Sequence, residues 1–342
     1  MKHSTLQRTA RWAGVAAIAA IALFATACSG GTPAPAAGGG DADSGERPGK
    51  TDITVIHAPI NYEPVYIAEQ EGYFDEVGLN VTIKPGGTPQ DNLAQVSGGS
   101  ADLAIISWDV AVTATSENLP VKVVSANAVV STEFDTSGIV VRADSGIESL
   151  KDLEGKTVAF NDLGSGGNVA VKQSFEAAGV DPSKVEDVLI PFAGMQAALE
   201  GAQVDAAFPS DAFYAQLSND PTYKVIDNPS REFRGGLPIT LWAATDPWLQ
   251  QNPGTADKFN EAMQKAADFY NDEANLDAVL AIRSEITGKP VDEVPKTLTP
   301  AALETPAGIA EETTQALKEF GFIDNEPKSV DEILWEDAPR SE

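Results

Sequence analysis

Past Lys50 the chain alternates short apolar runs with longer stretches whose apolar residues recur at the spacing of an amphipathic helix. This alternation constrains the fold most strongly, because short buried strands joined by helices are typical of βα units in a mostly parallel sheet. We therefore predict an α/β fold. Strands are expected at 53–58, 81–84, 102–107 and 121–126, with helices that begin near Pro64, Pro89 and Asp109.

A second run of the same kind follows residue 138. Strands are expected at 139–141, 157–160, 188–191, 205–208 and 224–226. After a further strand at 239–245 the apolar spacing is helical only, as at Phe259, Met263, Ala266 and Tyr270. Helices without strands must bury their apolar face against another element, so we expect them to pack on the first of two lobes.

The simplest organisation is two α/β lobes, with residues 51–136 and 239–342 in lobe 1 and residues 137–238 in lobe 2. The chain then crosses between the lobes twice, near 130–138 and 234–240. Two crossings predict a hinge.

The amino terminus has the features of an export signal. Lys2, Arg8 and Arg11 precede every acidic residue, and the 16 residues from 12 to 27 carry no charge. That stretch is shorter than the ~20 residues of a membrane-spanning helix. It ends in small residues directly before Cys28, which resembles a bacterial lipoprotein signal.

We therefore predict a signal peptide at 1–27, lipid attachment to Cys28, and a flexible linker rich in glycine, alanine and proline at 28–50. The lipid would hold the protein at the extracytoplasmic face of a bacterial cell membrane. A secreted protein cut after Ala27 and an uncut membrane anchor are the alternatives.

The charge and the scarcity of cysteine and histidine exclude several functions. The net charge of -28 disfavours nucleic acid and anionic lipid headgroups as partners. With one cysteine, the chain forms no intramolecular disulfide. His57 is the only histidine past the signal, so a zinc cluster is excluded and a catalytic triad could form only around His57. We expect no metal, no cofactor and no catalytic residue.

Four segments together resemble a known family. They are PVYIAEQEGYFDEVGLNV at 64–81, GGSADLA at 98–104, SLKDLEGKTV at 149–158 and AALEGAQVDAA at 197–207. In order and spacing, from about residue 53 to 270, the chain is similar to the solute-binding proteins of ABC importers for nitrate, sulfonates, taurine and the thiamine pyrimidine precursor. The resemblance implies a type II periplasmic-binding-protein fold that closes on a ligand between its lobes. It also implies an ABC permease and its ATPase as partners.

The ligand site is expected beyond the carboxyl ends of the strands, where loops and helix amino termini meet in open α/β sheets. The family binds through the same loops. The candidate ligand-binding residues are Asn61, Tyr62, Thr88, Trp108, Asp109, Asn161, Gly164, Ser165, Gly166, Gly167, Asn168, Ser210 and Asp211.

Several of these residues have a second interpretation. The glycine-rich loop at 164–167 could hold an oxyanion through its N–H groups and the helix dipole, or be an ordinary turn. Trp108 could stack on a ligand or belong to the core, and Asp109 could accept from the ligand or cap a helix. Arg231 and Arg234 could neutralise a ligand acid, but we expect a solvated loop there.

The charge of the ligand stays open at this point. Asp109, Asp162 and Asp211 favour an amino-bearing solute, whereas helix amino termini favour an anion. We expect a monomeric, extracytoplasmic solute-binding component of an ABC importer. Its solute is a small organic molecule, either an anion of the sulfonate, nitrate or taurine kind or an amino-heterocycle such as a thiamine pyrimidine precursor. A tethered surface protein that binds a protein partner is the alternative, and an enzyme is the weaker one.

Overall fold

The computed structural model describes residues 50–341, which lie in one compact unit. The predicted signal peptide at 1–27, Cys28 and nearly all of the linker at 28–50 lie outside the described residues. Within 50–341 no helix combines the length and apolar character needed to cross a membrane.

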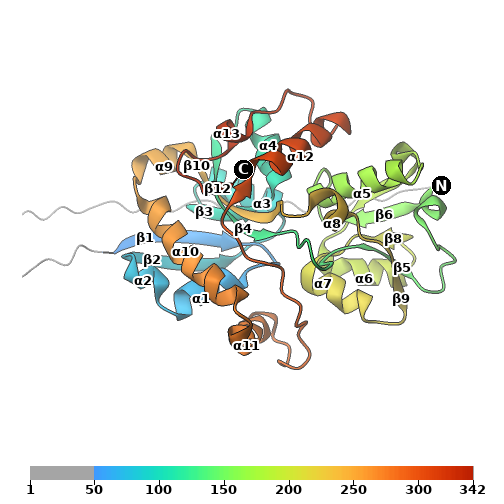
Figure 1. Cartoon of the computed structure of the whole chain (residues 1–342), viewed down its shortest axis with the longest axis horizontal. Coiled ribbons are helices and arrows are strands. Elements are labelled where there is room, and N and C mark those ends of the chain that lie inside the picture. The colour runs from blue at the N-terminus through green and yellow to red at the C-terminus, as the bar shows by residue number, and fades with distance from the viewer. Residues whose placement is uncertain (1–49, 342) are drawn as a thin grey trace, which may run out of the picture. The chain divides into compact units, whose positions relative to one another are not determined.

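Two five-stranded sheets form the framework (Figure 1). The first has the order β2-β1-β3-β10-β4 and the second the order β7-β6-β8-β5-β9. The strands of the first sheet are β1 (Thr51–His57), β2 (Leu79–Pro85), β3 (Leu103–Ile106), β4 (Val121–Val129) and β10 (Pro238–Thr245). Those of the second are β5 (Ile139–Arg142), β6 (Thr157–Phe160), β7 (Glu186–Leu189), β8 (Ala206–Ala207) and β9 (Tyr223–Asp227).

The α/β prediction is confirmed, and every predicted strand is present. The expected bounds of β7 were about two residues too late, because β7 is an edge strand that begins with charged residues, where the apolar pattern is weak. Glu186 pairs with Thr157 on β6, and Asp187 pairs with Val158.

The expectation of mostly parallel sheets is confirmed, with one reversed strand in each five-stranded sheet. β1 runs parallel to β2 and β3, whereas β10 runs antiparallel to β3 and β4. β6 runs parallel to β7 and β8, whereas β5 runs antiparallel to β8 and β9. The chain leaves the first sheet through β4 and returns through β10, so the returning strand runs in the opposite direction. β5, which enters the second sheet from that crossing, is reversed for the same reason.

Helices connect the strands and begin where the sequence supplies a cap or a proline. Thr88 and Asp91 form a capping box at the start of α3, and the side chains of Ser107 and Ser165 accept the first N–H groups of α4 and α5. The helices up to β10 are α1 (Glu63–Gln70), α2 (Tyr73–Glu76), α3 (Pro89–Ser97), α4 (Trp108–Ser116), α5 (Gly166–Ala177), α6 (Phe192–Glu200), α7 (Asp211–Ser218) and α8 (Pro229–Arg234), with single 3-10 turns at Leu150–Leu153 and Pro182–Lys184.

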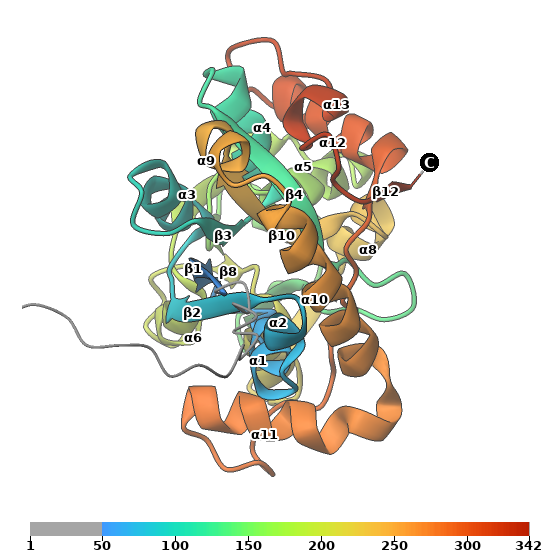
Figure 2. The same ribbon diagram turned by 90° about the vertical axis from the view of Figure 1, so that its left-hand side faces the viewer.

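The carboxyl-terminal third packs on the first sheet, as expected. α10 lies against α1 and β4 in Figures 1 and 2 and in the contacts, and buries Phe259 against Trp242 of β10 and Phe74 of α2, with ring centroids 5.1 and 5.8 Å apart. This segment comprises α9 (Asp246–Gln251), α10 (Thr255–Asn271), a 3-10 turn (Glu273–Asn275), α11 (Leu276–Thr287), α12 (Ala307–Glu319) and α13 (Val330–Ile333).

Two details of this segment differ from the expectation. It is not wholly helical, because β11 (Thr305–Pro306) and β12 (Arg340–Ser341) pair in parallel. Apolar periodicity cannot detect strands of two residues. In addition, α12 contacts both α4 and α5, so the helix touches elements that flank both sheets.

Candidate functional site

A cavity of about 100 Å³ lies between the two sheets, at the carboxyl ends of their parallel strands. Ala58 follows β1, Ser107 follows β3, and Phe208 follows β8. The amino-terminal turn of α5 and the end of α8 complete the wall. The cavity therefore lies where the strand-end rule for α/β sheets places a ligand.

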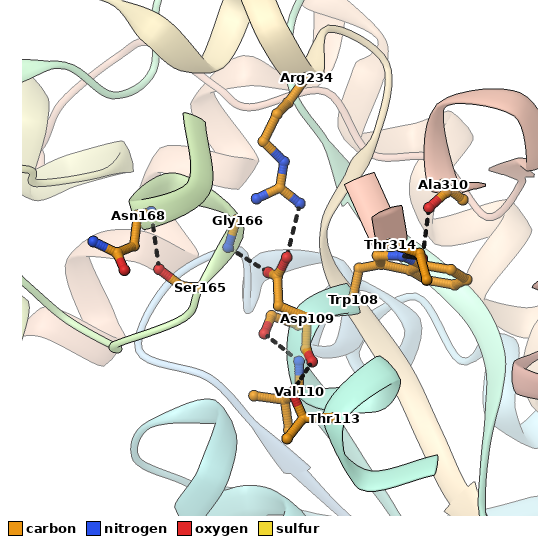
Figure 3. A network of polar contacts seen from close by, with 11 residues as sticks. Trp108, Asp109, Val110, Thr113, Ser165, Gly166, Asn168, Arg234, Ala310 and Thr314 are labelled. Atoms are coloured by element: carbon orange, nitrogen blue, oxygen red, sulfur yellow. Dashed lines mark hydrogen bonds and ion pairs between the residues drawn. The ribbon is translucent and has the colours of Figure 1, made fainter. Parts of the chain in front are cut away.

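The centre of the wall is a buried contact between three helices (Figure 3). Asp109, in the first turn of α4, accepts a hydrogen bond at Oδ2 from the N–H of Gly166 on α5, at 2.5 Å. Its Oδ1 lies 3.5 Å from Nη2 of Arg234 on α8. Burial raises the pKa of Asp109, while Arg234 and the Gly166 N–H oppose that rise. Burial lowers the pKa of Arg234, and Asp109 opposes this.

Two glycines let α5 approach its neighbours closely. A Cβ on Gly166 would lie 0.7 Å from Arg234 Nη1, and a Cβ on Gly167 would lie 2.5 Å from a ring carbon of Phe208. Any side chain at these positions would displace the guanidinium or the ring.

Asp162, in the loop between β6 and α5, supplies a second carboxylate and is only 5% exposed. Its Oδ1 accepts from Gln90 Nε2 of α3, whereas its Oδ2 has no hydrogen-bond partner within the described part of the chain. The pKa of Asp162 is raised to about 7. Burial is the largest cause, the hydrogen bond from Gln90 opposes the rise, and the charge of Asp109 adds to it.

Aromatic and aliphatic side chains form the remainder of the wall. The rings of Phe160 and Phe208 have centroids 6.1 Å apart, and Phe192 lines the same cavity. Together with Ile105, Ile106, Val130 and Ile239 they give the cavity apolar faces. The arrangement suits a flat apolar body held at its edge by a few polar groups.

Six candidate residues from the sequence line this cavity: Asp109, Asn161, Ser165, Gly166, Gly167 and Ser210. The other seven are outside its lining: Asn61, Tyr62, Thr88, Trp108, Gly164, Asn168 and Asp211.

Trp108 has the core role that was its second interpretation. Its side chain is fully buried, and its indole Nε1 donates to Thr314 Oγ1 of α12 at 3.0 Å (Figure 3). Thr88 caps α3, and the side chain of Asn168 accepts from the N–H of Gly164 at 3.1 Å. These last three residues shape the two loops beside the cavity.

Asn61, Tyr62 and Asp211 belong to a second buried polar cluster. Its centre is Arg283 of α11, whose Nε lies 2.6 Å from Glu63 Oε1 and whose Nη2 lies 3.9 Å from Asp211 Oδ1. The pKa of Asp211 is raised to about 6. Burial is the largest cause, the charge of Arg283 opposes the rise, and the charge of Glu63 adds to it. Burial, and next the charge of Glu63, raise the pKa of Tyr62. The backbone N–H of Asn61 faces the carboxylate of Asp211 and lowers its pKa. Both residues adopt positive φ.

The expectation of a solvated loop at Arg231 and Arg234 was wrong for Arg234, which is 6% exposed and lines the cavity. Arg231 is half-exposed and pairs with Asp135 at 2.9 Å. The sequence around an arginine near a crossing between the lobes does not indicate whether its side chain is buried or solvated. Phe160, Phe192 and Phe208 were not predicted as site residues. A single aromatic residue at the end of a strand or the start of a helix is also typical of the hydrophobic core.

Two α/β sheets with a cavity between them are the arrangement of the periplasmic-binding-protein fold, and solved structures share this fold. The aliphatic sulphonate binding protein SsuA from Escherichia coli superposes with a TM-score of 0.68 at 16% identity, over 84% of this chain and 98% of that one. The nitrate-binding protein NrtA from Synechocystis PCC 6803 also has a TM-score of 0.68, at 14% identity over 80% and 83%.

Residues 60–274 match the family model described as NMT1/THI5 like, and the chain belongs to this family. The putative binding protein YtlA of Bacillus subtilis is 23% identical over 241 residues, 69% of this chain and 70% of that protein. The 4-amino-5-hydroxymethyl-2-methylpyrimidine phosphate synthase of Aspergillus parasiticus is 26% identical over 231 residues, 64% and 66%. The chain thus spans about two thirds of that synthase. The resemblance inferred from the sequence, and the fold it implied, are confirmed.

Proposed function

We propose that the protein is the extracytoplasmic solute-binding component of an ABC importer. It captures a small organic solute between two lobes and delivers it to a membrane permease. The observation that carries this proposal is the cavity between the two sheets, crossed by the buried Asp109–Gly166–Arg234 contact. The relation to SsuA and NrtA, whose names state sulfonate and nitrate binding, supports the same role.

The proposed lobes are residues 51–136 with 239–342, and residues 137–238. Each sheet would be the centre of one lobe, with the connections between β4 and β5 and between α8 and β10 as the hinge. Opening would separate Asp109 from Gly166 and Arg234. A ligand that binds only the closed lobes then stabilises the protein by mass action.

We further propose that Cys28 is acylated and that residues 28–50 tether the folded part to the membrane. Cys28→Ser should release the protein from the membrane fraction of a bacterial host and abolish incorporation of radioactive palmitate. Labelling that persists in Cys28→Ser would contradict the lipid anchor without affecting the capture role.

The proposed role is capture without turnover, although fungal relatives have synthase names. A solute retained unchanged after long incubation, measured by mass spectrometry, would support capture. Conversion of a bound solute would contradict it.

The experiment for the main proposal is a thermal-shift screen of the full-length protein, unfolded and refolded to remove bound ligand. The panel contains nitrate, alkanesulfonates, taurine, aromatic carboxylates and aminopyrimidines. A binding solute at 100 times its Kd should stabilise the fold by about 2.7 kcal/mol. No saturable shift with any class, in protein shown to be folded, would contradict the solute-binding role and favour the protein-partner alternative.

A further inference from the structure

The carboxylate of Asp109 belongs to one proposed lobe, and the two groups that it contacts belong to the other (Figure 3). Asp109 lies in the first turn of α4, within residues 51–136. Gly166 on α5 and Arg234 on α8 lie within residues 137–238. One side chain of the protein therefore connects the two lobes across the wall of the cavity.

Asp109 contacts groups that a solute in the cavity would also meet. The first N–H groups of a helix have no partner within that helix, and a guanidinium carries a full positive charge. Asp109, Gly166 and Arg234 all line the cavity, yet Asp109 is only 2% exposed and Arg234 only 6%. The carboxylate thus compensates both groups from inside the protein.

A second polar contact connects the same parts of the two lobes. Gln90, in the first turn of α3, donates from Nε2 to Oδ1 of Asp162, in the loop before α5. Asp162 lines the cavity, as does Pro89 beside Gln90. Two helix starts of lobe 1 therefore contact residues 162–166 of lobe 2. Both contacts consist of protein groups alone.

The Arg283 cluster also joins the lobes, but it lies beside the proposed hinge. The N–H of Asp211 donates to the carbonyl oxygen of Thr136, in the connection between β4 and β5, at 2.7 Å. Contacts beside a hinge move least when lobes rotate. The contact of Asp109 with Gly166 crosses the cavity, so it has to break when the lobes separate.

We propose that the protein closes without solute: the carboxylate of Asp109 holds the lobes together through Gly166 and Arg234, and solute enters only after this contact has broken. The inference rests on the proposed solute-binding role and concerns the regulation of that site. Since only the open fraction of the protein can accept solute, closure by Asp109 lowers the apparent affinity in proportion to the closed fraction.

Asp109→Asn should open the lobes. In the closed form it would leave the guanidinium of Arg234 buried without a countercharge, which is strongly unfavourable, whereas the open form exposes Arg234 to water. The ratio of closed to open molecules should therefore fall about 10-fold or more.

Pulsed electron–electron double resonance measures this ratio as the distance between two spin labels. The labels are attached to Ser97→Cys at the end of α3 and Ala197→Cys on α6, both exposed. Cys28→Ser removes the only native thiol. This labelled full-length parent is unfolded and refolded to remove bound ligand. We expect one short distance in the parent, and a longer distance in addition once Asp109→Asn is introduced.

Arg234→Met tests whether charge pairing is the cause. Alone it should also open the lobes, because it leaves Asp109 buried without a cation. The double variant with Asp109→Asn carries neither charge and should be more closed than either single variant. Asp144→Asn is the matched control: it breaks an exposed pair with Arg142 inside lobe 2 and should leave the distance unchanged.

Circular dichroism and thermal unfolding verify that the variants are folded. A parent that is mainly open without solute would overturn the inference, and this result does not depend on whether any variant folds. Unchanged distances in the folded single variants, or a double variant more open than both, would overturn it too. Each of these outcomes leaves the solute-binding role intact, which fails only if the thermal-shift panel gives no shift.

Discussion

Gly166 occupies a position with no room for a side chain, since its Cβ would lie 0.7 Å from Arg234 Nη1. Gly166→Ala should therefore move the guanidinium away from Asp109 and destabilise the fold by about 1–3 kcal/mol, as overpacking does. Urea unfolding measures the change. The control is Gly308→Ala in the first turn of α12, where a Cβ meets nothing within 4 Å and alanine should be neutral or stabilising. Equal losses in the two variants would contradict the steric argument.

Asp162 should make stability depend on pH. Its pKa is about 7 in the fold, against about 3.9 in an unfolded chain, so the folded state binds more protons between these values. The contribution of Asp162 to stability is therefore greatest below pH 4 and is lost as the pH rises through 7. The charged and polar groups facing it are Gln90 and Asp109, with Arg234 in the same lining.

Asp162→Asn removes this dependence. In urea unfolding the stability of the variant relative to the wild type should rise with pH, by at most about 1.4 kcal/mol per pH unit, and level off above pH 7. A difference that is constant from pH 5 to pH 8 would show that Asp162 does not titrate in this range.

At the scale of elements, α12 joins parts of the chain that are far apart in sequence. It contacts α4 and α5, and Thr314 accepts from the indole of Trp108. Val169 of α5 belongs to the same apolar cluster as Leu317 of α12. α12 is thus in contact with both α4 and α5, whose first turns line the cavity.

Thr314→Val should destabilise the protein by about 1–3 kcal/mol, because it leaves the buried indole N–H of Trp108 without an acceptor. Ligand affinity should stay the same, since neither residue lines the cavity. Thr313→Val, one position earlier on α12 and also buried, is the control and should cost less. Urea unfolding and calorimetry separate the two effects, and a fall in affinity without a loss of stability would return Trp108 to the ligand site.

At the scale of the whole molecule, the Glu63–Arg283–Asp211 cluster links α1 and α11, beside the first sheet, to α7, beside the second. Arg283 is 1% exposed and also donates to the carbonyl oxygens of Pro295 and Thr297. Its charge compensates two buried carboxylates at once. The cluster thus joins the proposed lobes at a place separate from the Asp109–Arg234 pair.

Arg283→Met should destabilise the protein by about 3–5 kcal/mol at pH 8, because it leaves Glu63 and Asp211 buried without a cation. The loss should shrink toward pH 5, because the pKa of Asp211 is raised to about 6 and its carboxyl takes up a proton there. Chemical denaturation across this range measures it. Arg142→Met is the control. Arg142 forms a surface ion pair with Asp144 and donates to the carbonyl oxygen of Glu200, so the effect of this substitution should be small. A loss for Arg283→Met that does not vary with pH would contradict the electrostatic explanation.

Local sequence was enough for the elements and their order. Apolar periodicity, prolines at helix starts and capping residues act within a few positions, so the strands, α1 and α3 could be predicted without tertiary information. The segments that resemble the family, including 64–81 and 197–207, predicted the fold. Strand direction in β5 and β10 could not be obtained locally, because it follows from the path of the chain between two sheets.

The candidate site was predictable as a set of loops but not as a set of contacts. Strand ends brought Asp109, Asn161 and residues 165–167 to the cavity, since parallel strands end at one edge. The burial of Trp108 depends on Thr314, 206 positions away, and the burial of Arg234 depends on Asp109, 125 positions away. Burial and ion pairing are properties of the packed chain, so these roles appeared only once distant segments were in contact.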